Sequence, residues 1–221
     1  MKTHTVLSAS VIRSFGPRLF DPIVSEFQSA LKSKYRFQVG PQANPSVGLI
    51  AAYQAGRFSR KGKSIHVDQL NITYLDASRV TSIGVLTKST TDDGVGFLDD
   101  LMSWAKRRYR LKAPQTFPTF YHSQLEVVFD APFSQSFPTL QSLGKTVQSY
   151  LSNYGFDGPV YEPTSVLMFF DARDQQPPVP TPFSIERRVA TSFSDNKFFS
   201  QAPLTTKDHL AVLKQFEKSL G

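Results

Sequence analysis

The segments Gln28-Ser29-Ala30-Leu31 and Gln148-Ser149-Tyr150-Leu151 begin two stretches of this sequence that match each other. The match continues in the same order, with Tyr35, Phe37, Gly40-Pro41, Pro45 and Leu49 in the first stretch and Tyr154, Phe156, Gly158-Pro159, Pro163 and Leu167 in the second. A long internal period indicates one folding unit used twice. The sequence therefore predicts two related halves, at residues 1–113 and 119–221, which together form one compact pseudo-twofold domain.

The first half predicts the order strand, helix, strands, helix. Strands are expected at residues 5–13, 47–53 and 80–86, and a helix is expected to begin at Asp21-Pro22, where a capping oxygen precedes a proline. A hairpin should turn at Gly62-Lys63. Its apolar residues change parity between Val67 and Leu70, which predicts a bulge near Asp68-Gln69. A helix should follow Thr90 and carry Phe97, Leu98 and Leu101 on its buried face.

The second half repeats this order. Strands are expected at 125–129 and 183–189, the run 166–170 reads as a buried strand, and the last helix should begin near Thr205. A helix before the 166–170 run should carry one apolar stripe, formed by Leu140, Leu143, Val147, Tyr150, Leu151 and Tyr154. The predicted fold class is α+β: two strand–helix–strands–helix units share an antiparallel or mixed sheet, with the helices on one face.

The stretch Leu151–Pro159, followed by Val166–Asp171, resembles the helix-end, Gly-Pro and strand pattern of the GyrI-like effector-binding family. That family consists of duplicated strand–helix–strand–strand modules, so the resemblance implies a duplicated α+β fold. We find no residue at a position equivalent to the family's central acidic residue. The resemblance therefore implies no site residue in this chain.

Charge gives the first indication of a partner. The chain carries 25 Lys and Arg against 18 Asp and Glu, a net charge of +7, which favours acidic partners. Its basic residues gather in two places. The first is the hairpin Arg57–Lys63, with Arg57, Phe58, Arg60, Lys61 and Lys63; the second is a helix end with Lys106, Arg107, Arg108 and Arg110. A solvated turn and a dipole-matched helix end explain the same residues without a partner.

We therefore hypothesise a non-catalytic binding protein that recognises an acidic macromolecule, either nucleic acid or a protein surface. The alternative is a small-molecule binder with an aromatic cleft between the halves, and its candidate wall residues are Phe129, Tyr150, Tyr154, Phe169 and Phe170. An enzyme of unknown class is a third hypothesis. No spacing identifies a nucleophile with its base, so we name no catalytic residue.

The sequence contains no cysteine, which excludes disulfides, thiolate metal sites and a cysteine nucleophile. We expect no cofactor, no metal site and no membrane partner. His66 and Asp68 are spaced to share one side of a strand, but such a pair is more typical of a surface hydrogen bond than of a metal site. The polar N-terminus lacks the apolar core of a signal peptide, and we expect a cytoplasmic protein.

Overall fold

The computed structural model describes residues 1–15, 24–43, 49–74, 80–109, 118–158, 161–171, 173 and 179–219. In the first part of the chain the elements are β1 (Thr3–Ser14), α1 (Val24–Lys34), β2 (Val39–Ala43), β3 (Leu49–Arg60), β4 (Lys63–Tyr74), β5 (Val80–Thr87) and α2 (Thr91–Tyr109). The later elements are β6 (Thr119–Val128), α3 (Pro138–Ser152), β7 (Ser165–Met168), β8 (Phe183–Arg187), β9 (Lys197–Ala202) and α4 (Thr206–Lys218).

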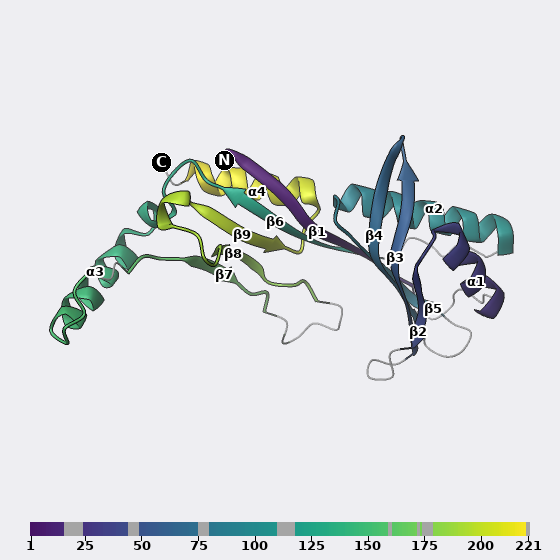
Figure 1. Cartoon of the computed structure of the whole chain (residues 1–221), viewed down its shortest axis with the longest axis horizontal. Helices are drawn as coiled ribbons and strands as arrows, with labels where there is room; N and C mark the ends of the chain where they lie inside the picture. Colours follow the sequence, from purple (N-terminus) through teal and green to yellow (C-terminus); the bar gives the residue numbers. More distant parts are fainter. Residues whose placement is uncertain are drawn as a thin grey trace. The chain divides into compact units, whose positions relative to one another are not determined.

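The described residues form an α+β fold with nine strands and four α-helices (Figure 1). The strands make an antiparallel sheet in the order β2-β3-β4-β5-β1-β6-β9-β8-β7. The predicted α+β class with an antiparallel sheet is therefore confirmed. No helix in the described part of the chain combines the length and apolarity that a membrane crossing requires.

The chain divides into two compact units. Unit 1 consists of Met1–Thr5, Gln124–Ala202 and Lys207–Gly221, and unit 2 consists of Val6–Ser123 and Pro203–Thr206. Each unit has its own core of buried aromatic and aliphatic side chains, and the two are described separately below.

The core of unit 2 lies between its strands and the helices α1 and α2. Phe27 and Leu31 of α1 are fully buried, and the ring of Phe27 packs edge-on against Tyr109 at 5.5 Å. Just after α1, the ring of Tyr35 lies 4.7 Å from the ring of Phe97 in α2. The large rings of Phe27, Tyr35 and Phe97 are therefore buried together, and Phe97 lies on the apolar face that the sequence predicts for α2.

The β3–β4 hairpin turns at Lys61-Gly62, one residue earlier than predicted. Lys63 pairs with Arg60 and so belongs to the strand. Lys61 and Gly62 have φ values of 48° and 76°, and two positive φ values are the requirement of the two-residue turn that matches strand twist. The predicted bulge is confirmed, because the β4–β5 register shifts between Val67 and Gln69.

Gly56 leaves room for an aromatic ring on β3. The residue is buried opposite Val67, and a Cβ added to it would overlap the ring of Phe37, which is itself buried. We expect Gly56→Ala to lower the free energy of unfolding by about 1–3 kcal/mol, because the ring must shift within a packed core. Urea unfolding of Gly56→Ala and of the exposed-site control Ser59→Ala measures this, and equal stability of the two variants would contradict the packing described here.

The core of unit 1 is aromatic. The ring of Phe129, just after β6, lies 5.4 Å from Phe198 of β9 and 5.7 Å from Phe216 of α4. Phe133 adds a ring 4.5 Å from Phe198. Leu213 of α4 is fully buried. Helix α4, which begins where the sequence predicts, therefore covers these strands with an apolar face.

One prediction for unit 1 is wrong. The run 166–170 was expected to be a buried strand, yet β7 ends at Met168, and Leu167, Met168, Phe169 and Phe170 are exposed. Helix α3 forms where the sequence predicts it, but among its residues only Gly144 is buried, so its apolar stripe is not packed on the strands of unit 1. An apolar run becomes buried only where another element covers it, and here no described element of unit 1 does so.

Two strands were not predicted from the sequence. β2 contains Gly40-Pro41, a pair untypical of strands, and β9 has the sequence Lys197-Phe198-Phe199-Ser200-Gln201-Ala202, which has a weak strand pattern. The predicted helix start at Asp21-Pro22 lies outside the described residues.

Candidate functional site

Strand alternation divides the basic residues of the hairpin into two sets. Arg60 and Lys63 pair across the hairpin and lie on its inner face, together with Phe58 and Ile65. A guanidinium nitrogen of Arg60 donates to the Asp92 carbonyl, and the Lys63 ammonium lies 3.3 Å from an oxygen of Asp93. This inner set therefore ties the hairpin to the first turn of α2.

The ion pairs of the inner set have a consequence at Asp93. Burial raises the pKa of this carboxyl, but the Ser89 hydroxyl and the charges of Lys63 and Arg60 outweigh it, so the pKa lies below its ordinary value. The carboxylate also accepts from the Ser89 hydroxyl. Arg60 and Lys63 thus have a structural role that accounts for their charge.

The outer face of the hairpin carries the second set. Arg57 pairs with His66, and Ser59 pairs with Ser64, so all four side chains share one face. All four are exposed. Lys61, at the tip of the turn, is exposed as well. His66 and Asp68 make the surface contact expected from their spacing, with 3.1 Å between Nε2 and Oδ1.

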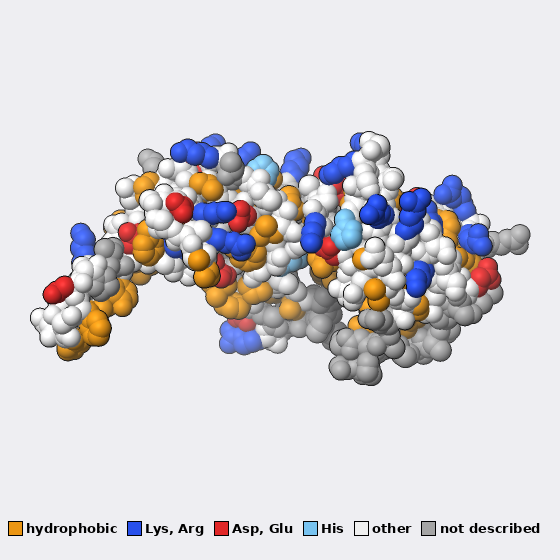
Figure 2. Space-filling model, in the orientation of Figure 1, with side chains coloured by type: hydrophobic (Ala, Val, Ile, Leu, Met, Phe, Trp, Pro, Cys, Tyr) orange, Lys and Arg blue, Asp and Glu red, His pale blue; other side chains and the backbone are white. Residues whose placement is uncertain are grey.

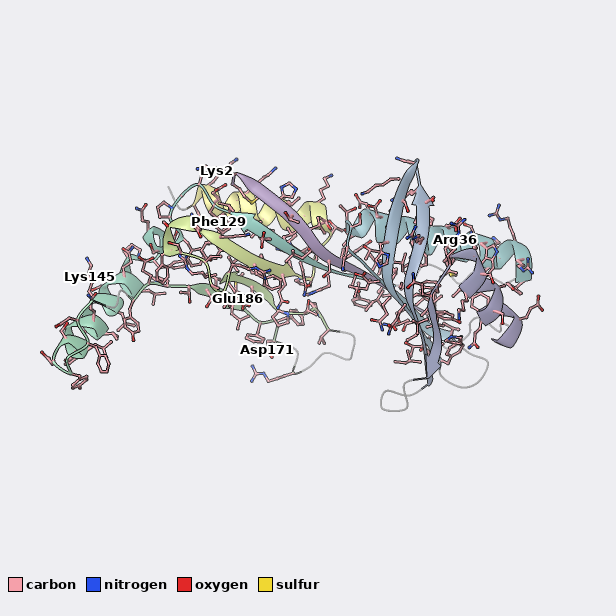
Figure 3. All side chains as sticks on the ribbon, in the orientation of Figure 1. Lys2, Arg36, Phe129, Lys145, Asp171 and Glu186 are labelled. Carbon is pink, nitrogen blue, oxygen red and sulfur yellow. The ribbon has the colours of Figure 1, made fainter. Side chains whose placement is uncertain are left out.

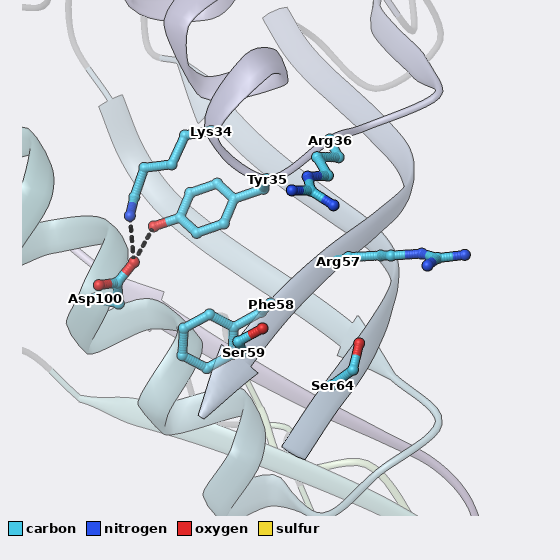
Figure 4. A pocket seen from close by; sticks show the side chains of 8 residues that line it. All are labelled: Lys34, Tyr35, Arg36, Arg57, Phe58, Ser59, Ser64 and Asp100. Atoms are coloured by element: carbon cyan, nitrogen blue, oxygen red, sulfur yellow. Dashed lines mark hydrogen bonds and ion pairs between the residues drawn. The ribbon is translucent and has the colours of Figure 1, made fainter. Parts of the chain in front are cut away.

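The end of α1 adds a second arginine to this outer face. The backbone N–H of Arg57 donates to the Tyr35 carbonyl at 2.7 Å, which brings Arg36 beside β3. Together these segments line a depression of about 350 Å³, formed by Lys34, Tyr35, Arg36, Arg57, Phe58, Ser59, Ser64 and Asp100 (Figure 4). Among the described residues, none forms an ion pair with Arg36 or Arg57.

Arg36 has an unusual backbone conformation. Its φ is 52°, in the left-handed region. The N–H of Arg36 donates to the Ser33 carbonyl, and the N–H of Phe37 donates to the Lys32 carbonyl. This pair of bonds is the Schellman motif, which places a left-handed residue, usually glycine, just past a helix end.

Helix α3 ends with the same motif but with a glycine. Gly155 donates to the Ser152 carbonyl, Phe156 donates to the Leu151 carbonyl, and Gly155 has a φ of 83°. Gly155 is the residue that the sequence match pairs with Arg36. The first segment therefore holds an arginine where glycine would adopt the same conformation without strain.

Asp100 of α2 anchors the inner side of the depression. Its carboxylate accepts from the Tyr35 hydroxyl at 2.7 Å and pairs with the Lys34 ammonium at 2.8 Å, whereas Arg57 points away from it (Figure 4). Burial raises the pKa of Asp100, but these two hydrogen bonds and the charges of Lys34 and Arg107 bring the pKa below the ordinary 3.8. Burial, and then the bond to Asp100, raise the pKa of Tyr35.

This anchor predicts a pH dependence of stability. Since the folded protein lowers the pKa of Asp100, its contribution is present above the unfolded value of 3.8 and is lost as the pH falls through the folded value. Asp100→Asn should be less stable than the wild type by about 1 kcal/mol at most near neutral pH, because the group is partly exposed. The difference should shrink below pH 3.8. Urea unfolding at both pH values measures it, and a difference that grows in acid would contradict the anchor.

The second basic cluster lies in the last turn of α2, towards the C-terminal side of Asp100, which lines the depression. Lys106, Arg107 and Arg108 are exposed in the last turn of α2, and Arg110 lies outside the described residues. The guanidinium of Arg108 is 5.8 Å from the centre of the Tyr109 ring. At 1.5 Å per residue, Lys106 is roughly 20 Å along the helix from Asp93, where the hairpin attaches, and roughly 9 Å from Asp100. The visible face of unit 2 carries several Lys and Arg side chains (Figure 2).

The candidate aromatic residues of the small-molecule hypothesis lie in different environments. Phe129 is buried in the core of unit 1, whereas Tyr150 and Tyr154 are exposed on and just after α3. Phe169 and Phe170 are exposed after β7. Figure 3 shows Phe129 among the strands of unit 1 and Lys145 on α3. These residues therefore do not line one common wall within unit 1.

A histidine and a serine meet in the core of unit 1. The Oγ of Ser200 lies 2.9 Å from Nε2 of His209, and Ser200 donates to the Ser184 carbonyl at 2.7 Å. All three residues are fully buried, so this pair has the surroundings of a core hydrogen bond. Within the described ranges, no three His, Asp or Glu side chains gather as a metal ion would require.

Sequence reasoning found Arg57 and Phe58 but missed Lys34, Arg36, Ser59, Ser64 and Asp100. These residues come from α1, the hairpin and α2, and non-local pairing brings them together. The one available signal was the match of Arg36 with Gly155, which marks a helix end where glycine is expected. No protein-family model matches this chain, and no curated protein matches it either.

Proposed function

We propose that this protein is a non-catalytic binding protein that recognises nucleic acid through the outer face of the β3–β4 hairpin and the adjoining Arg36. The observation that carries this proposal is the pair Arg36 and Arg57. Both are exposed, both line the same depression, and neither is neutralised by an ion pair with a described residue. Guanidinium groups with free donors are suited to phosphate oxygens, which they can bind in a bidentate manner.

The backbone conformation of Arg36 supports the proposal. A left-handed conformation costs a non-glycine residue on the order of 1 kcal/mol, and strain of this kind concentrates at functional sites. The matched position holds Gly155, which adopts the conformation freely. This chain therefore holds an arginine at a position where it costs stability, and this supports a role for its side chain.

The neighbouring groups fit a phosphate backbone. Ser59 and Ser64 present exposed hydroxyls beside Arg57, and serine hydroxyls commonly donate to phosphate. Lys61 at the turn adds a third exposed cation. The net charge of +7 favours approach to a polyanion.

Titration of labelled single- and double-stranded oligonucleotides, followed by fluorescence polarisation at several salt concentrations, tests the function. We expect binding at about 50 mM salt that weakens steeply towards about 200 mM, because neutralised phosphates release counterions. Binding that is independent of salt, or no binding to either form at low salt, would contradict the proposal. In the latter case an acidic protein surface would replace nucleic acid as the partner.

We propose further that the two halves arose by duplication. In unit 2 the first strand, β1, pairs with β5, which precedes the closing helix α2. The strand β6, whose residues 124–128 belong to unit 1, neighbours β9, which precedes the closing helix α4. The matched helix ends after α1 and α3 share the Schellman motif. This common order of elements supports the repeat, and a cytoplasmic location stays a prediction from the sequence.

A further inference from the structure

The apolar stripe of α3 is exposed to solvent. Leu143, Tyr150 and Tyr154 have exposed fractions of 58%, 60% and 71%, and Leu140 on the same stripe is also exposed. The helix contacts the remainder of unit 1 at Gly144, where an added Cβ would overlap the Tyr161 carbonyl. An amphipathic helix that leaves its apolar side in water lacks the packing that normally stabilises it.

A second apolar surface lies at the end of the sheet. β7 pairs with β8 along one side and is the last strand in the order of described strands. Leu167, Met168, Phe169 and Phe170 are exposed there, with Phe169 at 73%. Figure 2 shows hydrophobic side chains along α3 and again near β7. An exposed apolar edge strand is a site where another strand pairs.

The exposed apolar area is large enough for a stable interface. Four side chains on or next to α3 and four at β7 are each about half exposed or more. Since a large aromatic side chain has roughly 150–250 Å² of surface, the eight leave on the order of 1,000 Å² exposed. A standard interface buries about 800 Å² on each partner.

The same segment carries few charges. Between Phe137 and Phe170 the sequence has only Lys145, Asp157 and Glu162. Aromatic residues and Met without charges are typical of the buried centre of an interface, and homodimer interfaces are the most apolar. A charged partner would find few opposite charges to pair with on this surface, in contrast to the basic face of unit 2.

We infer that a second copy of this chain covers these surfaces, so that the protein forms a twofold-symmetric dimer through α3 and β7. The chain itself carries both a helix face in need of cover and a strand edge in need of a partner. A twofold axis satisfies both surfaces in both copies, and closed twofold dimers are the commonest homo-oligomers. Two antiparallel edge strands pair naturally about such an axis.

The matched segment of unit 2 shows what these residues do when they are covered. Leu31, Tyr35 and Phe37 are fully buried or nearly so, and Tyr35 packs against Phe97 of α2. Their counterparts in the second stretch include Tyr154 and Phe156, which are exposed. The dimer would bury the second set of residues as α2 buries the first.

The test is the mass of the full chain in solution, measured by light scattering or sedimentation. We expect about twice the chain mass of 24.7 kDa for the wild type at micromolar concentrations and above. Leu143→Glu with Tyr150→Glu should weaken the dimer at least tenfold. The matched control, Ser142→Glu with Ser149→Glu, adds the same charge to exposed positions on the opposite side of α3 and should stay dimeric.

Hydrogen exchange of the wild type gives a second readout that needs no variant. Amides of Ser165–Met168 should become more protected as the protein concentration rises, because β7 pairs in the dimer. A wild type that is monomeric at all concentrations tested would overturn the inference. In that case another protein, or another part of the same chain, would cover α3. The inference would also be overturned if Leu143→Glu with Tyr150→Glu stayed as dimeric as the serine control. The same holds if hydrogen exchange at β7 did not depend on protein concentration.

Discussion

Arg36→Gly combined with Arg57→Ala should weaken nucleic-acid binding roughly tenfold to hundredfold, since two contacts are lost and each is worth about 0.5–1.5 kcal/mol net. Glycine is the residue that the matched position 155 holds, so the first substitution copies a helix end that this chain already uses. The plot of log affinity against log salt should lose about two units of slope on duplex DNA, because two phosphate contacts disappear.

The same variant should not be less stable than the wild type. Arg36→Gly relieves a left-handed backbone conformation and should offset any loss at Arg57. Thermal unfolding in parallel with the binding titration therefore separates a lost contact from a damaged fold. The control is Lys145→Ala with Lys214→Ala, which removes two exposed cations from unit 1. If this control weakens binding as much as the arginine variant does, binding depends on the net charge of the protein and the proposed binding face is wrong.

Phe37→Ala should lower the free energy of unfolding by about 3–5 kcal/mol, whereas Phe156→Ala should change it by about 0.5 kcal/mol or less. The two residues occupy matched positions in the sequence. Phe37 is 3% exposed and packs 5.4 Å from the ring of Tyr53, whereas Phe156 is 63% exposed. The difference arises because α1 and α2 cover the first segment, while nothing in the described part of unit 1 covers the second.

Urea unfolding at submicromolar protein concentration measures this difference, since dilution keeps self-association from stabilising Phe156. Phe37→Leu is the conservative control and should recover most of the loss at that position. Equal destabilisation by the two alanine substitutions would mean that the second segment is buried within the single chain. The exposed aromatic surface of unit 1 would then not exist in solution.

Much of the fold could be predicted from the sequence because it depends on local period. The alternation in β4, its parity change at Asp68 and the apolar spacing of α2 each reflect one element and its buried face. The turn was misplaced by one residue because Lys61 adopts a positive φ, a conformation that is uncommon for lysine. The exposure of residues 167–170 could not be predicted, since it depends on which other element covers them.

The candidate site was less predictable than the fold. The basic hairpin was visible in the sequence. Strand alternation, however, places Arg60 and Lys63 on the inner face, where they contact α2, and places Arg57 on the outer face. Arg36 joins Arg57 only through the backbone bond from Arg57 to Tyr35, a contact between segments some twenty residues apart in the chain. Composition shows that basic residues are present, but only the paired strands show which of them are free to bind.

The most direct test of the proposed binding face is an NMR titration of the backbone amides with a short oligonucleotide. We predict that the largest shift changes occur at Arg36, Arg57, Ser59 and Ser64, with small changes in the last turn of α2 and throughout unit 1. Changes centred on Lys106–Arg108, or spread evenly over exposed lysines, would contradict the account.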